Sequence, residues 1–324
     1  MNNGLAQSGL VVGLHGHHVV VETPTGERVI CHARGKKSQC VVGDRVKWQA
    51  SKDEGTIEKI DPRRNLLYRQ DDIRSKQFAA NLDQVLFVLA AEPVFSESQL
   101  ARALISCEAA KIKPIIVLNK ADLTVPFNEA MKRLAPYKRM GYEVLGLAIK
   151  PKADVDSAQA QAKQVKQDEG ARETLMTLLK DKTTFVMGAS GVGKSSLINL
   201  LLPDADLATR EISTALNSGK HTTTTTSWFW LKDGEVGSKQ SAIIDSPGFQ
   251  EFGLHHVDKM LLAKLMPDFA QYDGQCRFYN CKHLQEPQCA VLANVSDAEV
   301  DTAISPSRHT FYARVFEELS QSKF

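Results

Sequence analysis

The octapeptide Gly188–Ser195 (GASGVGKS) has the residue types and spacing of a loop that binds phosphate groups, G-x-x-x-x-G-K-S/T. An apolar run at 185–187 precedes it and a helix-forming stretch at 196–201 follows it. Glycines let backbone N–H groups close around phosphate oxygens at the positive end of a helix. We expect Lys194 to neutralise β- and γ-phosphate charge and Ser195 to bind Mg²⁺. The predicted contacts are Gly188, Ala189, Ser190, Gly191, Val192, Gly193, Lys194, Ser195 and Ser196.

The tetrapeptide 119–122 (N-K-x-D) follows the apolar run 115–118 and suits the recognition of guanine. The Asp122 carboxylate can accept hydrogen bonds from N1–H and the N2 amino group of guanine. Adenine offers no such pair, so GTP should win in competition against ATP. The Lys120 stem can lie along the base, and Asn119 is expected to join this loop to the phosphate loop. The predicted base-binding residues are Asn119, Lys120, Ala121 and Asp122.

The tetrapeptide Asp245–Gly248 (DSPG) follows the apolar run 241–244 and fits D-x-x-G. Asp245 is expected to hold Mg²⁺ through water, and the N–H of Gly248 to sense the γ-phosphate. Each of these motifs alone has a simpler interpretation as a glycine-rich or strand-ending turn. Their occurrence together favours one nucleotide site, because independent signals agree.

A run of threonines at 222–226 lies between the phosphate loop and D-x-x-G. One of them should reach Mg²⁺ and the γ-phosphate in the GTP state only. We expect this residue to be Thr223, with Thr222 and Thr224 as alternatives. Such a run can also simply open a strand, since β-branched residues favour extended structure.

The residue after Gly248 is Phe249, at a position where many GTPases have a glutamine that orients the attacking water. Phenylalanine cannot do this. Intrinsic hydrolysis should therefore be slow, or the polar group must come from elsewhere. His256 is the preferred candidate, and His221 and His255 are the others, although any one of them can equally be a surface histidine.

Cys276, Cys281, His283 and Cys289 form a compact cluster, C-x4-C-x-H-x5-C. Three thiolates and an imidazole suit a closed, tetrahedral, structural Zn²⁺ site. Buried free thiols or a redox pair are the alternatives. Zinc would stabilise a segment that has few large apolar residues to bury.

The order of the motifs is unusual, because N-K-x-D at 119–122 precedes the phosphate loop. In the common order of GTPases the phosphate loop comes first. A circular permutation explains the difference, since strand order in space can persist when a chain is cut and rejoined elsewhere. In this order the chain runs from D-x-x-G directly to the cysteine cluster. We therefore expect the bound nucleotide to set the orientation of the zinc-binding part. The domain arrangement should then differ between the GDP-bound and GTP-analogue-bound states.

Short β-rich segments separated by turns fill residues 1 to 70 and suit a small barrel of the OB type. Apolar runs alternate with helical stretches from residue 81, which indicates an α/β domain with a mostly parallel sheet. The stretch 150–170 has few large apolar residues and is interpreted as an exposed insertion. We predict a multidomain α/β protein with an RNA-binding barrel at 1–75, a circularly permuted P-loop GTPase domain at 76–255 and a helical zinc-binding domain at 256–324.

The composition is that of an ordinary globular protein, 43% hydrophobic and 24% charged, with a net charge of +2. The N-terminus lacks the blocks of a signal peptide, and the apolar run 85–91 is too short to span a bilayer, so we expect a cytoplasmic, monomeric protein without a membrane partner. Residues 1–70 have 11 basic and 7 acidic side chains, a modest excess. Arg34, Lys36 and Lys37 are candidate RNA contacts, or a solvated face.

With these motifs in place, the chain resembles the circularly permuted ribosome-biogenesis GTPases of the RsgA (YjeQ) family. The resemblance rests on motif order, on 188–196, 219–224 and 245–253 (GASGVGKSS, GKHTTT, DSPGFQEFG), and on the cysteine cluster. It implies the three domains above, bound GTP or GDP, Mg²⁺ and Zn²⁺. It also implies binding to the small (30S) ribosomal subunit and its rRNA, a role in late subunit maturation, and GTP hydrolysis stimulated by the subunit. The family histidine after D-S-P-G matches His256.

The sequence departs from that family in two places. The stretch 144–149 lacks the serine with which the family usually contacts guanine, and 150–170 is longer than usual. One alternative function also stays open. The barrel and zinc domain can act as a nucleic-acid-binding module in which the nucleotide only sets conformation, and subunit maturation supported by a Ser195→Ala protein would favour that alternative.

Overall fold

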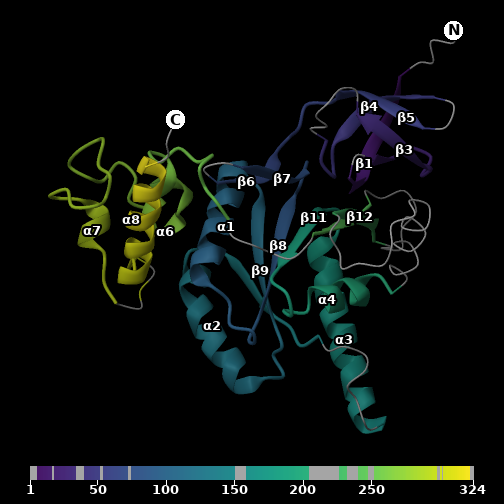
Figure 1. Cartoon of the computed structure of the whole chain (residues 1–324). Helices are drawn as coiled ribbons and strands as arrows, with labels where there is room; N and C mark the ends of the chain where they lie inside the picture. Colours follow the sequence, from purple (N-terminus) through teal and green to yellow (C-terminus); the bar gives the residue numbers. More distant parts are fainter. Residues whose placement is uncertain are drawn as a thin grey trace.

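The computed structural model describes residues 6–16, 18–33, 40–51, 54–71, 74–149, 158–203, 226–231, 240–246, 252–297, 300 and 302–321, with 158–167 as backbone only. Figure 1 shows a barrel near the N-terminus, a central sheet flanked by helices, and a C-terminal helical region on the far side of the sheet from the barrel. The expected RNA contacts Arg34, Lys36 and Lys37 lie outside the described residues.

Five strands close into the N-terminal barrel, in the order β1-β2-β3-β5-β4 with β4 returning to β1. Neighbouring strands are antiparallel except β3 and β5, which are parallel. Val11, Val21 and Trp48 point into its buried core. This arrangement confirms the predicted OB-type barrel. The strands are β1 Gln7–His15, β2 His18–Glu22, β3 Arg28–Ala33, β4 Arg45–Ala50 and β5 Gly55–Ile60.

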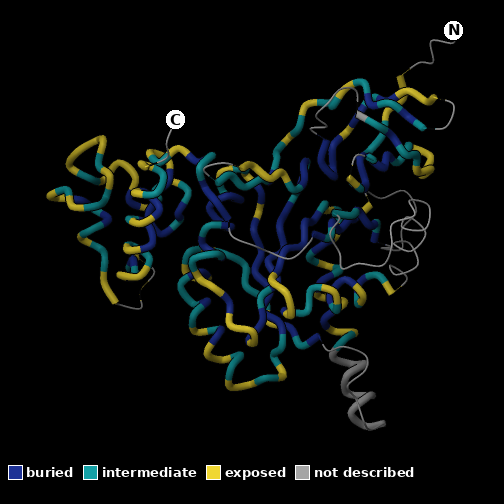
Figure 2. The backbone as a smooth tube through the Cα atoms, in the orientation of Figure 1, coloured by how far each residue is buried: buried dark blue, intermediate teal, exposed yellow. Residues whose placement is uncertain are grey.

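The central sheet has the order β10-β9-β8-β11-β13-β12, and all its strands are parallel except β12. The apolar runs of the sequence form its middle strands, which Figure 2 shows as buried. The phosphate-loop strand β11 lies between β8 and β13 although β8 precedes it by far in the chain. The strands are β8 Gln84–Ala90, β9 Lys113–Asn119, β10 Glu143–Gly146, β11 Thr183–Gly188, β12 Ser227–Trp230 and β13 Ala242–Asp245.

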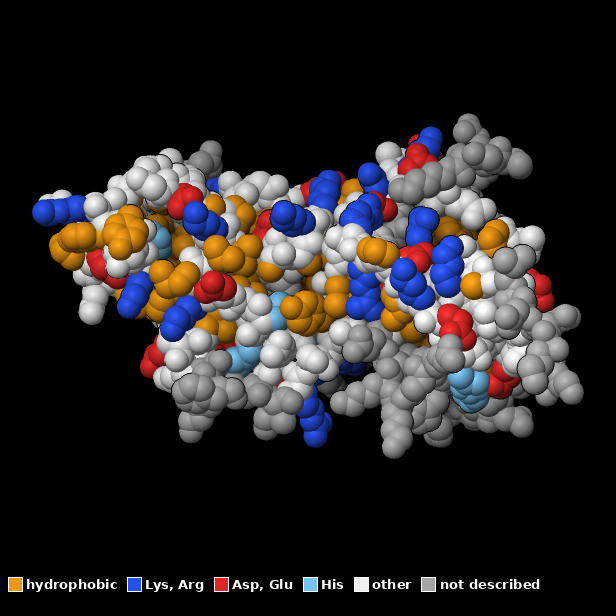
Figure 3. All heavy atoms as spheres, turned by 90° about the horizontal axis from the view of Figure 1, so that it is seen from above, with side chains coloured by type: hydrophobic (Ala, Val, Ile, Leu, Met, Phe, Trp, Pro, Cys, Tyr) orange, Lys and Arg blue, Asp and Glu red, His pale blue; other side chains and the backbone are white. Residues whose placement is uncertain are grey.

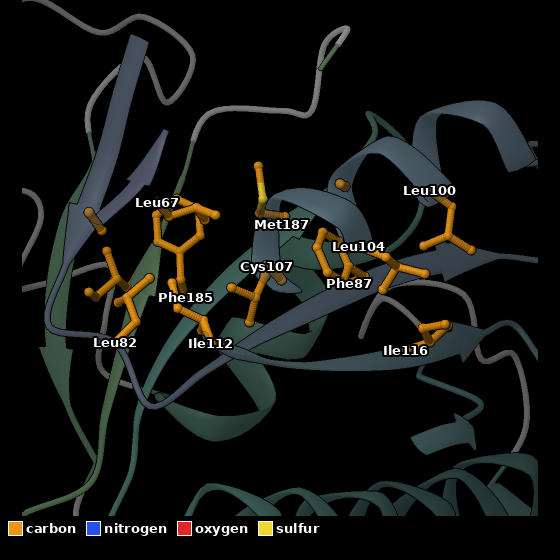
Figure 4. Packing of buried hydrophobic residues seen from close by; sticks show 14 of the residues in the cluster. Leu67, Leu82, Phe87, Leu100, Leu104, Cys107, Ile112, Ile116, Phe185 and Met187 are labelled. Carbon is orange, nitrogen blue, oxygen red and sulfur yellow. The ribbon is translucent and has the colours of Figure 1, made fainter. Parts of the chain in front are cut away.

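Helices cover both faces of this sheet, because alternate residues of each buried strand point to opposite sides. On one face, Phe185 and Met187 of β11 pack with helices α1 (Glu97–Ala110) and α2 (Thr124–Arg139), as Figure 4 shows for part of this core. On the other face, Val186 packs against helices α3 (Ala158–Leu179) and α4 (Lys194–Leu201).

The β6–β7 hairpin (Leu66–Gln70 and Ser75–Ala80) was not predicted and links the barrel to the sheet. The boundary expected between residues 75 and 76 falls inside β7, whose residues pair with those of β6. Leu67 and Ala79 join the same core as Val12 and Val42 of the barrel region. The barrel also continues the central sheet directly, since Gly13 of β1 pairs with Ser227 of β12.

Residues 158–170, part of the stretch interpreted as an exposed insertion, form the first part of α3. Alanine, glutamine, lysine and glutamate are strong helix formers, which accounts for a helix where large apolar residues are few. The following turns anchor it, since Ala171, Leu175 and Leu179 are buried against the sheet.

The C-terminal region packs on α1 with a core of its own. Ala101 and Ile105 of α1 contribute to that core together with Phe269, Tyr312 and other buried side chains. Its elements are η1 Leu262–Leu265, α6 Pro267–Ala270, α7 Ala290–Ala293 and α8 Pro306–Gln321. Among the described residues, no helix is both long and apolar enough to cross a membrane.

Candidate functional site

The carboxyl ends of β9, β11 and β13 meet at one edge of the sheet and bring the three nucleotide motifs together. In spatial order these strands are β9, β8, β11 and β13, with all pairs parallel. N-K-x-D follows β9, the phosphate loop follows β11 and D-x-x-G follows β13. Ligands of open α/β sheets bind at this edge. The chain order is permuted, but the motifs converge as a single site requires.

The phosphate loop turns from β11 into α4 through glycines in the left-handed region. Gly191 has φ +79° and Gly193 has φ +95°. A Cβ atom at Gly193 would lie 2.2 Å from the Asn119 Nδ2 atom, so this position also needs glycine for space. Ala189, Ser190 and Gly191 are exposed, and α4 begins at Lys194. The loop therefore presents its backbone to solvent at a helix N-terminus.

Asn119 joins the base-recognition loop to the phosphate loop. Its Nδ2 donates to the Val192 carbonyl oxygen at 3.1 Å, and its Oδ1 accepts from the Ile149 backbone N–H at 2.9 Å. The side chain is 1% exposed, so both hydrogen bonds are shielded from water. Asn119 thus fixes the spacing between the loops expected to bind base and phosphates.

The rest of N-K-x-D is held by backbone contacts and leaves Asp122 exposed. Lys120 has φ +66°, and its Nζ donates to the Glu92 carbonyl oxygen at 2.5 Å. The Ala121 N–H donates to the Leu147 carbonyl oxygen at 2.9 Å. The segment at 147–149 therefore lies against the motif without a serine. The resemblance pointed to the stretch 144–149, but the individual contacts and the Glu92 carbonyl group were not identified, because backbone donors and acceptors have no residue-type signal.

Lys194 lies between the phosphate loop and D-x-x-G. Its Nζ is 2.6 Å from Asp245 Oδ1 and 2.6 Å from the Ser246 carbonyl oxygen. The side chains of Lys194 and Asp245 are only 11% and 16% exposed, which strengthens their attraction. Ser246 is buried and donates its hydroxyl to the Val186 carbonyl oxygen of β11. The cation expected at the phosphates and the carboxylate expected at Mg²⁺ thus occupy one small volume.

Several predicted site residues fall outside the part of the chain that the structure describes. They are Thr222, Thr223, Thr224, His221, Gly248 and Phe249. Their assignments stay predictions. Ser195 and Ser196 are described, and both lie in the first turn of α4 beside Lys194.

His256 lies beyond this gap, with its ring on Tyr68 of β6 at a centroid distance of 4.3 Å. Its Nδ1 is buried without a hydrogen-bond partner. Burial, and secondarily the neighbouring His255, lower the pKa of His256 to about 4. Gln70 of β6 holds this segment in place by accepting a hydrogen bond from the His255 N–H. The imidazole is therefore neutral near pH 7 and faces the hairpin.

Acidification should destabilise the chain through His256. The unfolded state takes up a proton near pH 6.5 and the folded imidazole only near about 4, so stability is lost as pH falls through this window. A His256→Phe variant keeps the ring against Tyr68 and removes the titration. Urea unfolding should give similar stabilities at about pH 8 and a smaller loss for the variant at about pH 5. Parallel losses in both proteins would contradict this assignment.

The Cys/His cluster has the geometry of a tetrahedral metal site. The four predicted ligand atoms lie within 4.8 Å of one another. Cys276 Sγ is 3.8 Å from Cys289 Sγ, and His283 Nδ1 is 3.5 Å and 3.4 Å from these two sulfur atoms. Zinc bonds of about 2.3 Å to sulfur and about 2.0 Å to nitrogen at tetrahedral angles require separations of about 3.5–3.8 Å. The residues present therefore fit a closed Zn²⁺ site.

Surrounding groups orient these ligands. The backbone N–H groups of Ala290 and Leu292 donate to Cys276 Sγ and Cys289 Sγ, at 3.3 Å and 3.5 Å. N–H donors of this kind stabilise thiolate ligands. His309 on α8 contacts the His283 carbonyl oxygen through its Nε2 at 2.8 Å. Helix α8 thereby holds the metal-binding loop against the C-terminal core.

Comparisons with known proteins agree with this architecture. The model of the RsgA GTPase family matches residues 60–166 and 157–255. The "Small ribosomal subunit biogenesis GTPase RsgA" of Variovorax paradoxus is 56% identical over 99% of this chain and 95% of that protein. The protein of the same name from Paraburkholderia phytofirmans is 50% identical over 97% of this chain and 93% of its own length.

Solved structures are similar over nearly the whole chain as well. The crystal structure of YjeQ from Thermotoga maritima has a TM-score of 0.68 and 27% identity, with 98% of this chain and 99% of that chain covered. The structure of YloQ, described as a circularly permuted GTPase, has a TM-score of 0.66 and 27% identity, with coverages of 98% and 96%. With motifs, strand order and relatives in agreement, this chain belongs to the RsgA GTPase family.

Proposed function

We propose that this chain binds GTP with Mg²⁺, hydrolyses it to GDP and phosphate, and acts in the late maturation of the small ribosomal subunit. The observation that carries the proposal is the convergence of three guanine-nucleotide motifs at one sheet edge, joined by the hydrogen bonds of Asn119. The names of the relatives support the role in subunit biogenesis. We expect the chain to act as a cytoplasmic monomer.

The residues of the motifs divide the chemistry in a way that suits phosphoryl transfer. Lys194 and the loop amides bind the phosphates and stabilise charge that develops as water attacks the γ-phosphorus in line. Ser195 and Asp245 are the groups that would hold Mg²⁺, together with Thr223. Mg²⁺ supplies charge neutralisation at the phosphate oxygens when bound. Gly248 would sense the γ-phosphate.

Guanine specificity should depend on Asp122. We expect Asp122→Asn to weaken GTP binding by roughly 10²–10⁴-fold, since each of two hydrogen bonds to the charged group is worth about 1.5–3 kcal/mol. Xanthine has a carbonyl group at C2, which can accept from the new amide, so binding of XTP should improve. Competition binding with GTP, XTP and ATP in the same preparations provides the control, because improved XTP binding requires a folded site. Unchanged GTP affinity would exclude Asp122 from base recognition.

The partner in this proposal is the small subunit and its rRNA. The barrel is a suitable contact, since residues 1–70 have 11 basic and 7 acidic side chains. Figure 3 shows Lys and Arg side chains, with Asp and Glu among them, over the middle and right of one face. The ring of His256 faces Tyr68, so a catalytic role for His256 requires the segment around it to move when the subunit docks. The zinc site serves a structural role, because its four protein ligands leave no open coordination position.

The experiment that tests the proposal is GTP turnover with and without purified small subunits. Completion of an active site by a partner raises turnover by about 10³–10⁵-fold in other GTPases, and we expect a rise of more than about tenfold here. Purified large subunits serve as the control. Equal rates with small subunits, large subunits and no subunits would overturn the proposed activation, and His256→Ala with full stimulation would remove His256 from it.

A further inference from the structure

We propose that the barrel carries a second metal site, formed by His18, His32 and Glu54, which takes a divalent transition-metal ion such as Zn²⁺. One ligand atom from each of these side chains lies within 4.8 Å of the others. The histidines come from the neighbouring strands β2 and β3 and Glu54 from the residue before β5, far in sequence from the cysteine cluster. This site is separate from the nucleotide site and does not depend on the function proposed above.

The strand register places these side chains together. Val19 of β2 pairs with Cys31 of β3, so His18 and His32 are cross-strand neighbours. Val19 and Cys31 are 1% and 0% exposed and point into the barrel core, and side chains alternate along a strand, so both histidines point outward.

Glu54 reaches the same two side chains from the residue immediately before β5. The parallel β3–β5 ladder pairs Gly55 with Cys31 and Thr56 with His32. Glu54 immediately precedes this ladder, and its carboxylate contacts the His32 ring directly. A Cβ atom at Gly55 would lie 2.5 Å from Cys31 Sγ, so the two strands approach closely here. The two histidines are thus fixed by paired strands of the closed barrel, and Glu54 by its position directly before β5.

The donor atoms have the chemistry of an open zinc site. The His18 and His32 rings are 4.9 Å apart at an interplanar angle of 56°. His32 Nε2 contacts Glu54 Oε2 directly. His18 Nδ1 is buried and has no hydrogen-bond partner among the described residues. Two imidazoles and one carboxylate are the protein ligands of zinc sites that keep one position for water.

Access and ligand type define which ions suit this site. The side chains of His32 and Glu54 are 42% and 38% exposed, so an ion can enter from solvent. Imidazole nitrogen favours Zn²⁺, Co²⁺, Ni²⁺ and Cu²⁺ over Mg²⁺ and Ca²⁺. Three ligands without thiolate should hold the ion more weakly than the Cys3His cluster, so this ion should exchange readily. Without a metal, the contact between His32 and Glu54 would be an ordinary charge-assisted hydrogen bond.

A neighbouring histidine provides a matched control. His15 of β1 is paired with His18 in the β1–β2 hairpin, so it lies next to the cluster. The His15 ring lies near Gly13, because a Cβ atom built on that glycine would be 3.5 Å from His15 Nε2. His15 is not one of the three residues whose ligand atoms converge. Replacing His15 therefore removes an adjacent imidazole without removing a predicted ligand.

The test is a Co²⁺ titration of the full-length chain whose cysteine site is already filled with zinc, prepared without a histidine tag. We expect one further equivalent of Co²⁺ to bind, with visible d–d absorption and no thiolate-to-cobalt charge-transfer band. His18→Ala and His32→Ala should each weaken Co²⁺ binding by more than about 100-fold, because loss of a residue that only hydrogen-bonds to a metal ligand already weakens binding by roughly 10–100-fold. Glu54→Gln should weaken it less, and His15→Ala should leave it within about twofold.

Three results would overturn the proposal. One is the absence of further Co²⁺ binding to the parent chain. Another is a charge-transfer band, which would locate the added metal at the cysteines. The third is equal binding by the His15, His18 and His32 variants. Circular dichroism and retained zinc in each variant show whether the compared proteins are folded. If an alanine variant does not fold, the Glu54→Gln variant still tests the site, because it keeps both histidines.

Discussion

Replacing Lys194 with alanine is expected to lower GTP turnover by about 10²–10³-fold, the usual effect of removing one group that stabilises transition-state charge. Lys194 is the cation of the described phosphate loop, and its Nζ lies 2.6 Å from Asp245 Oδ1. Substitution should also weaken GTP binding, because the triphosphate loses its nearest positive charge. Turnover at saturating GTP, measured together with nucleotide affinity, separates these two effects.

Lys182→Ala is the matched control for this experiment. Lys182 is exposed and precedes the same strand, β11, at the end away from the phosphate loop. It should leave turnover unchanged. The Lys194 variant also leaves Asp245 without this ion-pair partner, so its thermal stability must be measured alongside. If turnover of a folded Lys194→Ala protein falls by less than about threefold, Lys194 does not act in the transition state in the way P-loop lysines do.

Much of the fold follows from local signals in the sequence. The buried runs that form β8, β9, β11 and β13 are continuous and apolar, as strands covered on both faces must be. The β6–β7 hairpin gave no such signal. Its strand 75–80 begins with three exposed polar residues. Only Ala79 and Ala80 are buried, and Ala79 packs in the core shared by the barrel and the sheet. Tertiary packing decides such segments.

The candidate site was predictable as far as its chemistry rests on residue types. The phosphate loop, N-K-x-D and the cysteine cluster each require particular side chains at particular spacings. The contacts that position these motifs do not require particular side chains, so the sequence does not reveal them. Leu147 and Ile149 support the base-recognition loop through their backbone groups, which any residue supplies. The orientation of His256 toward Tyr68 likewise depends on how the segment after D-x-x-G pairs with β6.

The C-terminal region is connected to the nucleotide site through more than the chain itself. Leu254 forms a bridge with Gln70 at the end of β6. Arg102 of α1 forms an ion pair with Glu318 of α8 across the interface. Helix α1 begins after the carboxyl end of β8, beside the phosphate-loop strand. A change in the position of α1 or of 252–255 would therefore be passed on to the C-terminal region through these contacts.

Loss of a zinc ligand is expected to have the largest effect on structure. Cys289→Ser removes one of the four proposed zinc ligands. Cys289 is 3% exposed and also caps helix α7 by accepting from the Leu292 N–H. Structural zinc contributes about 10–16 kcal/mol of apparent binding free energy, and this is available to hold 276–289 in place. We expect the variant to lose its tightly held zinc and the amides of 276–289 to exchange with solvent several orders of magnitude faster.

The effect should stop at the boundary of the C-terminal core, because that core does not rest on the metal alone. Asp268 and Arg308 form a buried ion pair with two hydrogen bonds, and Phe269 packs on Tyr312 at a centroid distance of 4.6 Å. Helix α8 should therefore keep most of its protection. Cys40→Ala, at a buried cysteine of the barrel, should retain zinc and normal exchange. Zinc content and amide hydrogen exchange of each variant test this expectation. If the amides of 276–289 stay equally protected from exchange in zinc-free protein, the hydrophobic core and not the metal folds this segment.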